Sequence, residues 1–261
     1  MSTGVERIAA AFAAAPGRAA LMPYLMGGFP TVAGSIAVGE GYADSGADLV
    51  ELGVPFSDPL ADGPVIHAAA TRALHAGATL HGVLEAGARI AERVPVVAMC
   101  YANPILARGL ERFVADLADR AISGLIVPDL PLEEAASVRA ACDAAGVALV
   151  PLVAPTTPPA RLHAIGAAAR GFVYTVSVTG TTGERAAVRH DLGPLLARVK
   201  AATAVPVAVG FGISTSEHAA AAAAAGADGV IVGTRLVRAV DEEGPAGAAA
   251  HVAHLAAALV R

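Results

Sequence analysis

The chain has 261 residues and a net charge of −5, and 55% of its residues are hydrophobic. This length suits one large domain, and the apolar content supplies a large core. No cluster of Lys and Arg forms a basic patch, which argues against a nucleic-acid partner. No apolar run reaches the roughly 20 residues that a membrane-spanning helix needs. We therefore expect a cytoplasmic protein in which Cys100 and Cys142 are buried free thiols.

Short apolar runs alternate with helical patterns along the chain. Residues 8–15 form an amphipathic pattern without a basic leader, which indicates a first helix and not a signal peptide. Strand-like runs follow at residues 21–26, 48–53, 95–101, 124–127, 147–153, 172–176, 205–210 and 229–232. Helical patterns separate them, for example at residues 31–46, 108–121, 132–145 and 215–225. Gly46, Gly146 and Gly226 each follow such a pattern, where a left-handed C-cap favours glycine.

The order of these elements predicts the fold class. Nearly continuous apolar strands between helices indicate a parallel sheet that is covered on both faces. Eight such units predict an α/β fold, a single (β/α)8 TIM barrel, with an extra helix at the N-terminus. The longest interval between strands, from 53 to 95, adds an extra helix after strand 2, near 66–77. No linker divides the chain, so we expect one domain over residues 1–261.

The most informative segment is VELGVPFSDPLADGP at residues 50–64. A β-rich run brings Glu51 to the end of a strand, and the Pro-stiffened loop after it carries Asp58 and Asp62. In a barrel, the loops that follow strands form the catalytic face. Apolar neighbours should raise the pKa of Glu51 by desolvation, whereas Asp62 should be better solvated and ionised. Two carboxyl groups in unlike surroundings can divide acid and base roles.

Each carboxyl group also has a purely structural interpretation. Glu51 could pair with an Arg side chain inside the barrel. Asp62 could cap the helix that begins near Val65, because Asp-Gly-Pro is also ordinary turn chemistry. These alternatives stay open at this point.

Glycine-bearing loops follow the last three strands: Gly180 to Gly183, Gly210 to Ser214, and Gly233-Thr234. Glycine lets backbone N–H groups approach an anion, and a helix that begins at Ser214 or Thr234 would direct its positive end toward it. Loops after strands seven and eight hold phosphate in many barrels. These loops predict a substrate that bears a phosphate monoester.

The sequence does not favour lysine-dependent covalent catalysis or metal catalysis. The one Lys of the chain, Lys200, lies in the helix before the seventh strand and so at the end of the barrel away from the catalytic loops. Schiff-base and covalent pyridoxal phosphate mechanisms both need a Lys in the site, so neither is available. The His residues, including His251 and His254, do not combine with strand-end carboxylates into a ligand set. We expect no metal.

Taken together, these segments resemble the α subunit family of tryptophan synthase over essentially the whole chain. The run ELGVPFSDPLADG at residues 51–63 matches that family's signature without a gap and is more specific than any glycine motif. Further matches are Tyr101-Ala102-Asn103, Tyr174 with Ser177, Thr182-Gly183, and Gly210-Phe211-Gly212-Ile213-Ser214.

The resemblance implies a lyase of tryptophan biosynthesis. It would cleave indole-3-glycerol phosphate to indole and glyceraldehyde 3-phosphate in a retro-aldol reaction that uses no cofactor. At the matching positions, the catalytic residues would be Glu51 as acid–base, Asp62 as acceptor of the indole N–H, and Tyr174 beside Glu51. The substrate-binding residues would be Tyr24, Tyr101, Thr182, Gly183, Gly212, Gly233 and Thr234.

The resemblance also implies motion and a partner. Thr182 would contact Asp62 when the sixth loop closes, and the polar segment 183–190 is interpreted as a mobile lid. A β subunit, itself a pyridoxal phosphate enzyme, would receive indole within an α2β2 heterotetramer. The expected contacts lie in loops 55–59 and 103–106, at Pro55, Asp58, Pro59 and Asn103. Asp58 would relay the state of the partner to Asp62, which makes the assembly allosteric.

The chain departs from the family pattern at the eighth-strand phosphate loop. Thr234 stands where Ser is common, so a hydroxyl is kept. Arg235 stands where a small residue is common, and we expect it to face solvent.

Two rival functions remain. The first is another phosphate-binding barrel enzyme of the same pathway, such as the synthase that makes indole-3-glycerol phosphate, which is expected to use a catalytic Lys on an early strand. The second is a non-catalytic regulatory subunit, against which the intact Glu51, Asp62 and Tyr174 weigh.

Overall fold

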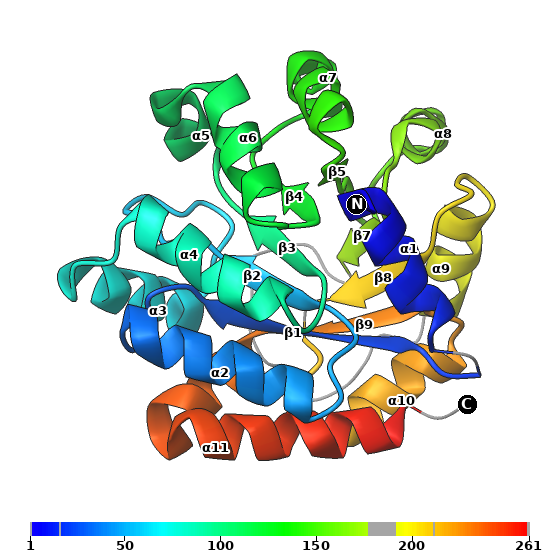
Figure 1. Ribbon diagram of the computed structural model, residues 1–261. Helices are drawn as coiled ribbons and strands as arrows, with labels where there is room; N and C mark the ends of the chain where they lie inside the picture. The colour runs from blue at the N-terminus through cyan, green and yellow to red at the C-terminus, as the bar shows by residue number, and fades with distance from the viewer. Residues whose placement is uncertain (1, 16, 177–191, 211, 260–261) are drawn as a thin grey trace.

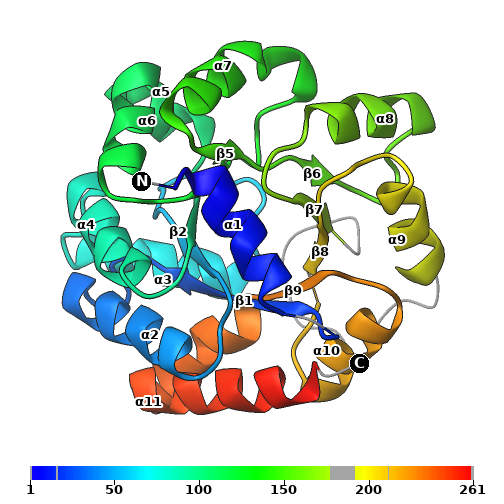
Figure 2. The ribbon, with the colours of Figure 1, turned by 45° about the vertical axis from the view of Figure 1, so that its right-hand side comes forward.

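The strands form a ring that helices surround (Figures 1 and 2). The computed structural model describes residues 2–15, 17–176, 192–210 and 212–259. Its parallel strands are β1 (Ala20–Met26), β2 (Val50–Gly53), β3 (Val96–Met99), β4 (Gly124–Ile126), β5 (Ala148–Leu149), β6 (Leu152–Val153), β7 (Val173–Val176), β8 (Val207–Gly210) and β9 (Gly229–Val232). They lie in the order β5-β4-β3-β2-β1-β9-β8-β7-β6.

The first and last members of this order close the ring. β5 and β6 both lie in the run 147–153, which was predicted as one strand, and Val150 and Pro151 separate them. The Val150 N–H donates to the Leu125 carbonyl and the Tyr174 N–H donates to the Pro151 carbonyl, both at 2.9 Å. The same run therefore pairs with β4 on one side and with β7 on the other. The predicted (β/α)8 barrel is confirmed, with its fifth strand interrupted where proline lacks an N–H group.

One helix of the outer layer follows each barrel strand. These helices are α2 (Val32–Asp44), α4 (Leu80–Ala91), α6 (Leu110–Asp119), α7 (Ala136–Ala145), α8 (Pro159–Ala168), α9 (Leu192–Lys200), α10 (Ser216–Ala224) and α11 (Thr234–Ala258). α11 bends at Gly244, where φ is 72°, just before Pro245. None of the helices in the described part of the chain is both long and apolar enough to cross a bilayer.

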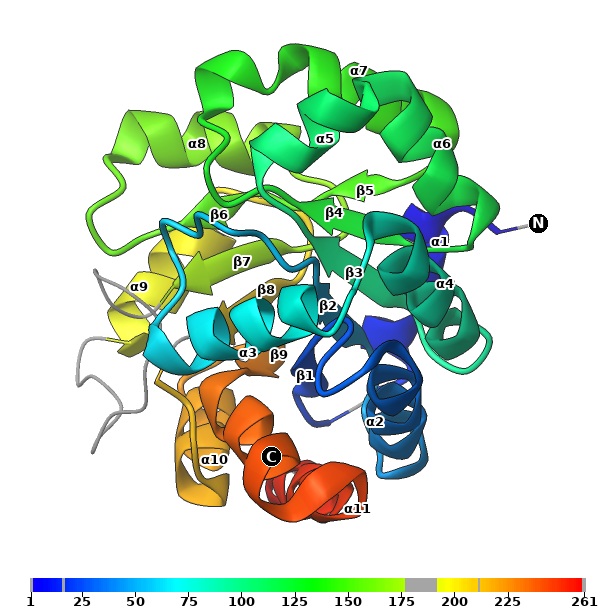
Figure 3. The ribbon, with the colours of Figure 1, turned by 90° about the vertical axis from the view of Figure 1, so that its left-hand side faces the viewer.

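The structure adds α1 (Gly4–Ala13), α3 (Pro64–His75) and α5 (Ala102–Arg108) to this layer. The sequence predicted α1 and α3, and Figure 3 shows α3 between the loop after β2 and α11. The prediction of a loop at 103–106 is wrong, because these residues belong to α5. Pro104 lies in the first turn of α5, where a missing N–H costs nothing, so this proline did not exclude a helix. Gly109, with φ of 87°, then separates α5 from α6.

Helix α1 closes the amino-terminal end of the barrel, and Figure 2 shows it lying across that end. A capping box fixes its first turn, in which the Glu6 N–H donates to Thr3 Oγ1 and the Thr3 N–H donates to Glu6 Oε2. Ile8 is fully buried among the side chains that fill the barrel, and the Phe12 ring lies 5.7 Å from the Phe172 ring. This end is sealed, so a ligand must enter from the other end.

Two aspartates hold the sealed end in register. The Asp48 carboxylate accepts two hydrogen bonds of 2.6 Å from Arg18 and one of 2.8 Å from the Leu21 N–H. The Asp228 carboxylate accepts one of 2.7 Å from Lys200 and one of 3.0 Å from the Val207 N–H. Each carboxylate therefore joins a strand to a neighbouring cation. The predicted place of Lys200, away from the catalytic face, is confirmed.

We expect Asp48→Ala to lower the free energy of unfolding by about 2 kcal/mol, because it leaves the Leu21 N–H and Arg18 without their acceptor. Denaturant titration measures this loss. The control is Asp44→Ala, which removes an exposed pair with Arg93 and should cost less than about 1 kcal/mol. Equal losses of stability in the two variants would show that the hydrogen bonds of Asp48 with Arg18 and the Leu21 N–H do not stabilise the barrel.

Candidate active site

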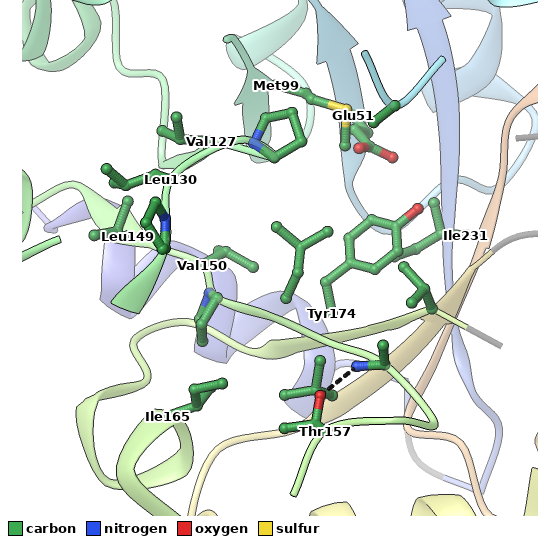
Figure 4. Close-up of a pocket in the computed structure, with 18 of the residues that line it drawn as sticks. Glu51, Met99, Val127, Leu130, Leu149, Val150, Thr157, Ile165, Tyr174 and Ile231 are labelled. Atoms are coloured by element: carbon green, nitrogen blue, oxygen red, sulfur yellow. Dashed lines mark hydrogen bonds between the residues drawn. The ribbon is translucent and has the colours of Figure 1, made fainter. Parts of the chain in front are cut away.

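A cavity of about 510 Å³ lies at the carboxyl ends of the strands. It is lined by side chains from several strands and from the loop after β2, among them Tyr24, Glu51, Asp62, Met99, Tyr174 and Ile231. In Figure 4, the Glu51 carboxyl group and the Tyr174 hydroxyl point toward the same space, beside Met99 and Ile231. The three expected catalytic residues therefore share one cavity.

Glu51 lies on β2 and is 1% exposed. None of the described residues donates a hydrogen bond to its Oε1 atom. Burial, with a smaller contribution from the negative charge of Asp62, raises the pKa of Glu51 to about 8. No ion pair joins Glu51 to an Arg among the described residues, so the alternative in which it pairs with an Arg finds no support there; Arg185 and Arg189 lie outside the described residues. Strand packing instead keeps a protonated carboxyl group at neutral pH.

Asp62 lies on the loop between β2 and α3 and is more exposed than Glu51, as predicted. Burial nevertheless raises its pKa, while a hydrogen bond with Tyr101 and the nearby His67 oppose that shift. The alternative in which Asp62 caps α3 is wrong, because the N-cap residue is Gly63 and α3 has no side-chain cap hydrogen bond. The Asp62 side chain faces the cavity instead.

Tyr101 holds the loop that carries Asp62. Its hydroxyl accepts a 3.0 Å hydrogen bond from the Ala61 N–H and also bonds to the Asp62 carboxyl group. The Tyr101 ring packs against the Phe56 ring with centroids 5.5 Å apart. Tyr101 is buried, but it is not among the residues that line the cavity. Its contacts are with the loop after β2 and not with the cavity itself.

Two buried tyrosines lie over glycines at strand ends. A Cβ atom on Gly53 would lie 2.0 Å from the Tyr24 hydroxyl oxygen, and one on Gly210 would lie 2.4 Å from the Tyr174 hydroxyl oxygen. Burial and the charge of Glu51 raise the pKa of both tyrosines, with Asp62 adding to the effect at Tyr24. Only glycine leaves room for these rings. In the sequence, Gly53 belongs to the signature run and Gly210 to an expected anion-binding loop. The space that each leaves for a tyrosine ring could not be predicted from these motifs.

The cavity wall at the ends of β8 and β9 carries part of the predicted phosphate site. Gly212, Gly233 and Thr234 line the same cavity, and α11 begins at Thr234 as predicted. Helix α10 begins at Ser216, two residues later than the predicted start at Ser214. Thr182 and Gly183, the segment 183–190, Ser177 and Phe211 lie outside the described residues. The glycine positions that are described lie where an anion could meet the start of a helix.

Arg235 does not extend into solvent, so that prediction is wrong. Its side chain is 24% exposed and contacts Glu243 at 3.3 Å and His251 at 2.7 Å across the bend of α11. His251 Nε2 also lies 3.0 Å from Glu243. The described residues contain no group of three or more His, Cys, Asp and Glu side chains that could hold a metal ion. Cys100 and Cys142 are buried free thiols, as expected.

The rim around the cavity carries exposed apolar side chains. Asp58 and Asn103 are exposed, whereas Pro55 is buried and shapes the loop from inside. Leu60 is 81% exposed and Leu106 is 67% exposed, which are the large exposed hydrophobic residues of the described chain. Leu106 is the last residue of the expected contact segment 103–106, whereas Leu60 lies just beyond the other expected segment, 55–59, and was not predicted as a contact. Neither leucine could be recognised earlier, because an apolar residue in a sequence does not reveal its exposure.

A closed barrel with paired carboxyl groups and a glycine-rich wall belongs to the class of (β/α)8 barrel enzymes that act at the carboxyl ends of their strands. Comparison with known proteins narrows this class. A profile of the family described as "Tryptophan synthase alpha chain" matches residues 11–259. The tryptophan synthase alpha chain of Prochlorococcus marinus (strain MIT 9313) is 46% identical over 233 residues, which cover 88% of this chain and 85% of that protein. The alpha chain of Synechococcus sp. (strain CC9902) is 49% identical over 224 residues, covering 85% and 83%.

Solved structures agree with the sequence comparison. A structure of Mycobacterium tuberculosis tryptophan synthase has a TM-score of 0.93 and 39% identity, with both chains fully covered. A structure of the tryptophan synthase a2b2 complex from Pyrococcus furiosus has a TM-score of 0.85 and 36% identity, covering 92% of this chain and 98% of that chain. The chain belongs to the tryptophan synthase alpha chain family, whose members are lyases of tryptophan biosynthesis.

We expect Gly53→Ala to lower the free energy of unfolding by about 1 to 3 kcal/mol, because the new methyl group overlaps the buried Tyr24 hydroxyl. Tyr24→Phe in the same chain should recover part of that loss, and a double-mutant cycle by thermal or denaturant unfolding measures the coupling. Gly82→Ala is the control. It lies in α4 with its nearest contact at 3.4 Å and should be neutral or stabilising. Additive costs in the cycle would contradict the overlap.

Proposed function

We propose that this chain is a cofactor-independent carbon–carbon lyase, the α subunit of a cytoplasmic tryptophan synthase. It would cleave indole-3-glycerol phosphate to indole and glyceraldehyde 3-phosphate. The observation that carries the proposal is the buried Glu51 carboxyl group, with its pKa of about 8, in one cavity with Asp62 and with Gly212 and Gly233. We also infer one domain, because α1 packs into the barrel that the rest of the chain forms.

Glu51 would act first as an acid. At neutral pH its carboxyl group holds a proton and can deliver it to the ring carbon that bears the glycerol chain. The bond between that carbon and the chain then breaks, and its electron pair returns to the ring. The adjacent hydroxyl loses its proton as the aldehyde forms, and the ionised Glu51 can accept it. Proton and charge therefore balance over one cycle without another group.

Asp62 would stabilise the intermediate. Protonation at carbon leaves positive charge on the indole ring, and a carboxylate that accepts a hydrogen bond from the ring N–H offsets that charge. Tyr24, Met99, Tyr174 and Ile231 supply the apolar walls that an indole ring requires. The phosphate would lie against Gly212, Gly233 and Thr234, with Gly183 as a further proposed contact.

The β subunit is the proposed partner, in an α2β2 assembly. Exposed Leu60 and Leu106 stand beside Asp58, Pro59 and Asn103 on the rim of the cavity. An apolar pair within a polar rim is the composition of a protein interface. Indole is small and apolar, so direct passage to a pyridoxal phosphate enzyme at this face would prevent its loss. Asp58 remains the proposed relay toward Asp62.

A lysine-dependent barrel enzyme is the less favoured function. Lys200, the one Lys of the chain, binds Asp228 at the sealed end and so lies on the wrong side for such chemistry.

The decisive assay incubates the purified chain with indole-3-glycerol phosphate, with and without a β subunit, and measures free indole. Glu51→Gln should reduce kcat/KM at least about 100-fold, because it keeps the shape of the side chain but cannot transfer a proton. Undiminished cleavage by Glu51→Gln would refute the mechanism, whereas no free indole from the unaltered chain under either condition would favour the non-catalytic subunit.

We expect kcat/KM to fall as the pH rises through about 8, because Glu51 must be protonated and its pKa is raised to about 8. It should also fall in acid, where Asp62, whose pKa is raised by burial, loses its charge. Asp62→Asn removes the negative charge that helps to raise this pKa, so the alkaline limb of its residual activity should move to lower pH. A pH profile of the residual Glu51→Gln activity that kept the same limb would assign the titration to another group.

We expect Tyr101→Phe to reduce kcat/KM about tenfold with little change in thermal stability, since the Ala61 N–H and Asp62 lose the hydroxyl that positions them. Steady-state kinetics and thermal unfolding measure the two effects. Tyr42→Phe is the matched control, because the buried Tyr42 hydroxyl has no hydrogen-bond partner among the described residues. Equal values of kcat/KM in the two variants would show that the Tyr101 hydroxyl does not position the catalytic loop.

A further inference from the structure

The cavity continues beyond the barrel interior. Its lining includes Val150 and Tyr174, which belong to the side chains that fill the barrel, and also Leu149 and Ile165, which pack between the barrel wall and the outer helices. Figure 4 shows Leu149 and Ile165 on the side of Val150 that is remote from Glu51. The two regions connect at the fifth strand, where β5 ends at Leu149 and β6 begins at Leu152.

We call the outer region the side compartment. Its walls are one face of α7 with the residue before it, one face of α8, and the interrupted strand, and its lining residues are Ala135, Arg139, Leu149, Arg161, Ile165 and Ala168. Protein interiors are ordinarily close-packed, and voids larger than a water molecule are few. The side compartment is therefore an unusual space beneath two outer helices, and most of its walls are apolar.

The charges of the side compartment are unequal. Arg161 makes two hydrogen bonds to Glu133, at 2.6 and 2.8 Å, which neutralise it. Arg139 also lines the compartment and is half-buried, but it makes no side-chain hydrogen bond or ion pair with any residue that the structure describes. A half-buried cation in an apolar wall gains free energy from an anionic partner. Thr157 Oγ1 accepts a 2.9 Å hydrogen bond from the Ala154 N–H, which leaves its O–H free to donate.

We infer that the side compartment is a second binding site, continuous with the reaction cavity but away from Glu51, for a small aromatic carboxylate. The apolar ring would lie between Leu149 of the sheet and Ile165 of α8, and the carboxylate would bond to Arg139. Neutral aromatic molecules would fit the walls but would leave the cation unpaired. Phosphorylated sugars would supply the charge but bury polar groups against leucine and isoleucine. This inference does not depend on the proposed reaction.

Benzoate is the probe, and benzamide is its uncharged counterpart. Titration of the full chain by calorimetry should give a Kd for benzoate of about 1 mM, as befits so small a ligand, with benzamide at least about tenfold weaker. In methyl NMR spectra, benzoate should shift the signal of Ile165 and leave that of Ile231, in the reaction cavity, unchanged. Shifts confined to Ile231 would place benzoate in the reaction cavity and overturn the inference.

Arg139→Gln should weaken benzoate binding at least about tenfold, because it removes a charged hydrogen-bond donor. Arg112→Gln removes the same charge from the exposed face of α6 and should bind benzoate like the unaltered chain. Ala168→Leu should exclude benzoate by filling the compartment. Both lining variants should keep their thermal unfolding temperature and any cleavage of indole-3-glycerol phosphate. Unchanged benzoate affinity in Arg139→Gln would refute the site, whatever the outcome of the cleavage assay.

Discussion

A carboxyl group that is buried in a β-barrel, with no ion-pair partner among the residues that the structure describes, is the constraint on which the site depends. Desolvation of Glu51 favours its neutral form and so stores a proton where the cavity begins. The pairing of β2 with β1 on one side and β3 on the other fixes Glu51 in register, and this pairing holds the carboxyl group in place despite the free-energy cost of its desolvation. Asp62 lies on the loop after β2 and is more exposed than Glu51, so its carboxyl group is better solvated. One strand and its loop thus produce two carboxyl groups with different proton affinities.

Glycine and tyrosine make this arrangement geometrically possible. Gly53 follows Glu51 by two positions on β2 and leaves space for the Tyr24 hydroxyl, while Gly210 leaves space for that of Tyr174. The charge of Glu51 acts on both tyrosine hydroxyls, so the two rings lie near its carboxyl group, and apolar ring surface there adds to its burial. The same glycines that give the chain its motif therefore help to set the proton affinity of its acid. Packing and electrostatics are not separable here.

The sequence was sufficient for the barrel, for the extra helices α1 and α3, and for the grouping of Glu51, Asp62 and Tyr174, because these follow from periodicity, strand ends and one specific motif. It was insufficient where the answer depends on neighbours in space. Pro104 looked like a loop residue until its place in the first turn of α5 was known. Arg235 looked solvent-bound because Glu243 and His251 reach it only across the bend of α11. The exposure of Leu60, and the absence of a partner for Arg139 among the described residues, likewise depend on how the folded chain is assembled.

The break in the fifth strand and the continuous pairing of β1 with β9 bound two halves of one sheet, β1 to β5 and β6 to β9. Glu51 and Asp62 belong to the first half, whereas Gly212, Gly233 and Thr234 follow strands of the second. The distance between Glu51 and the glycines that would bind the phosphate therefore depends on the pairing of β1 with β9 and on the break at Val150 and Pro151. A ligand that contacts both sets of groups would link the two halves of the sheet, and the distance between the halves would limit the length of ligand that fits.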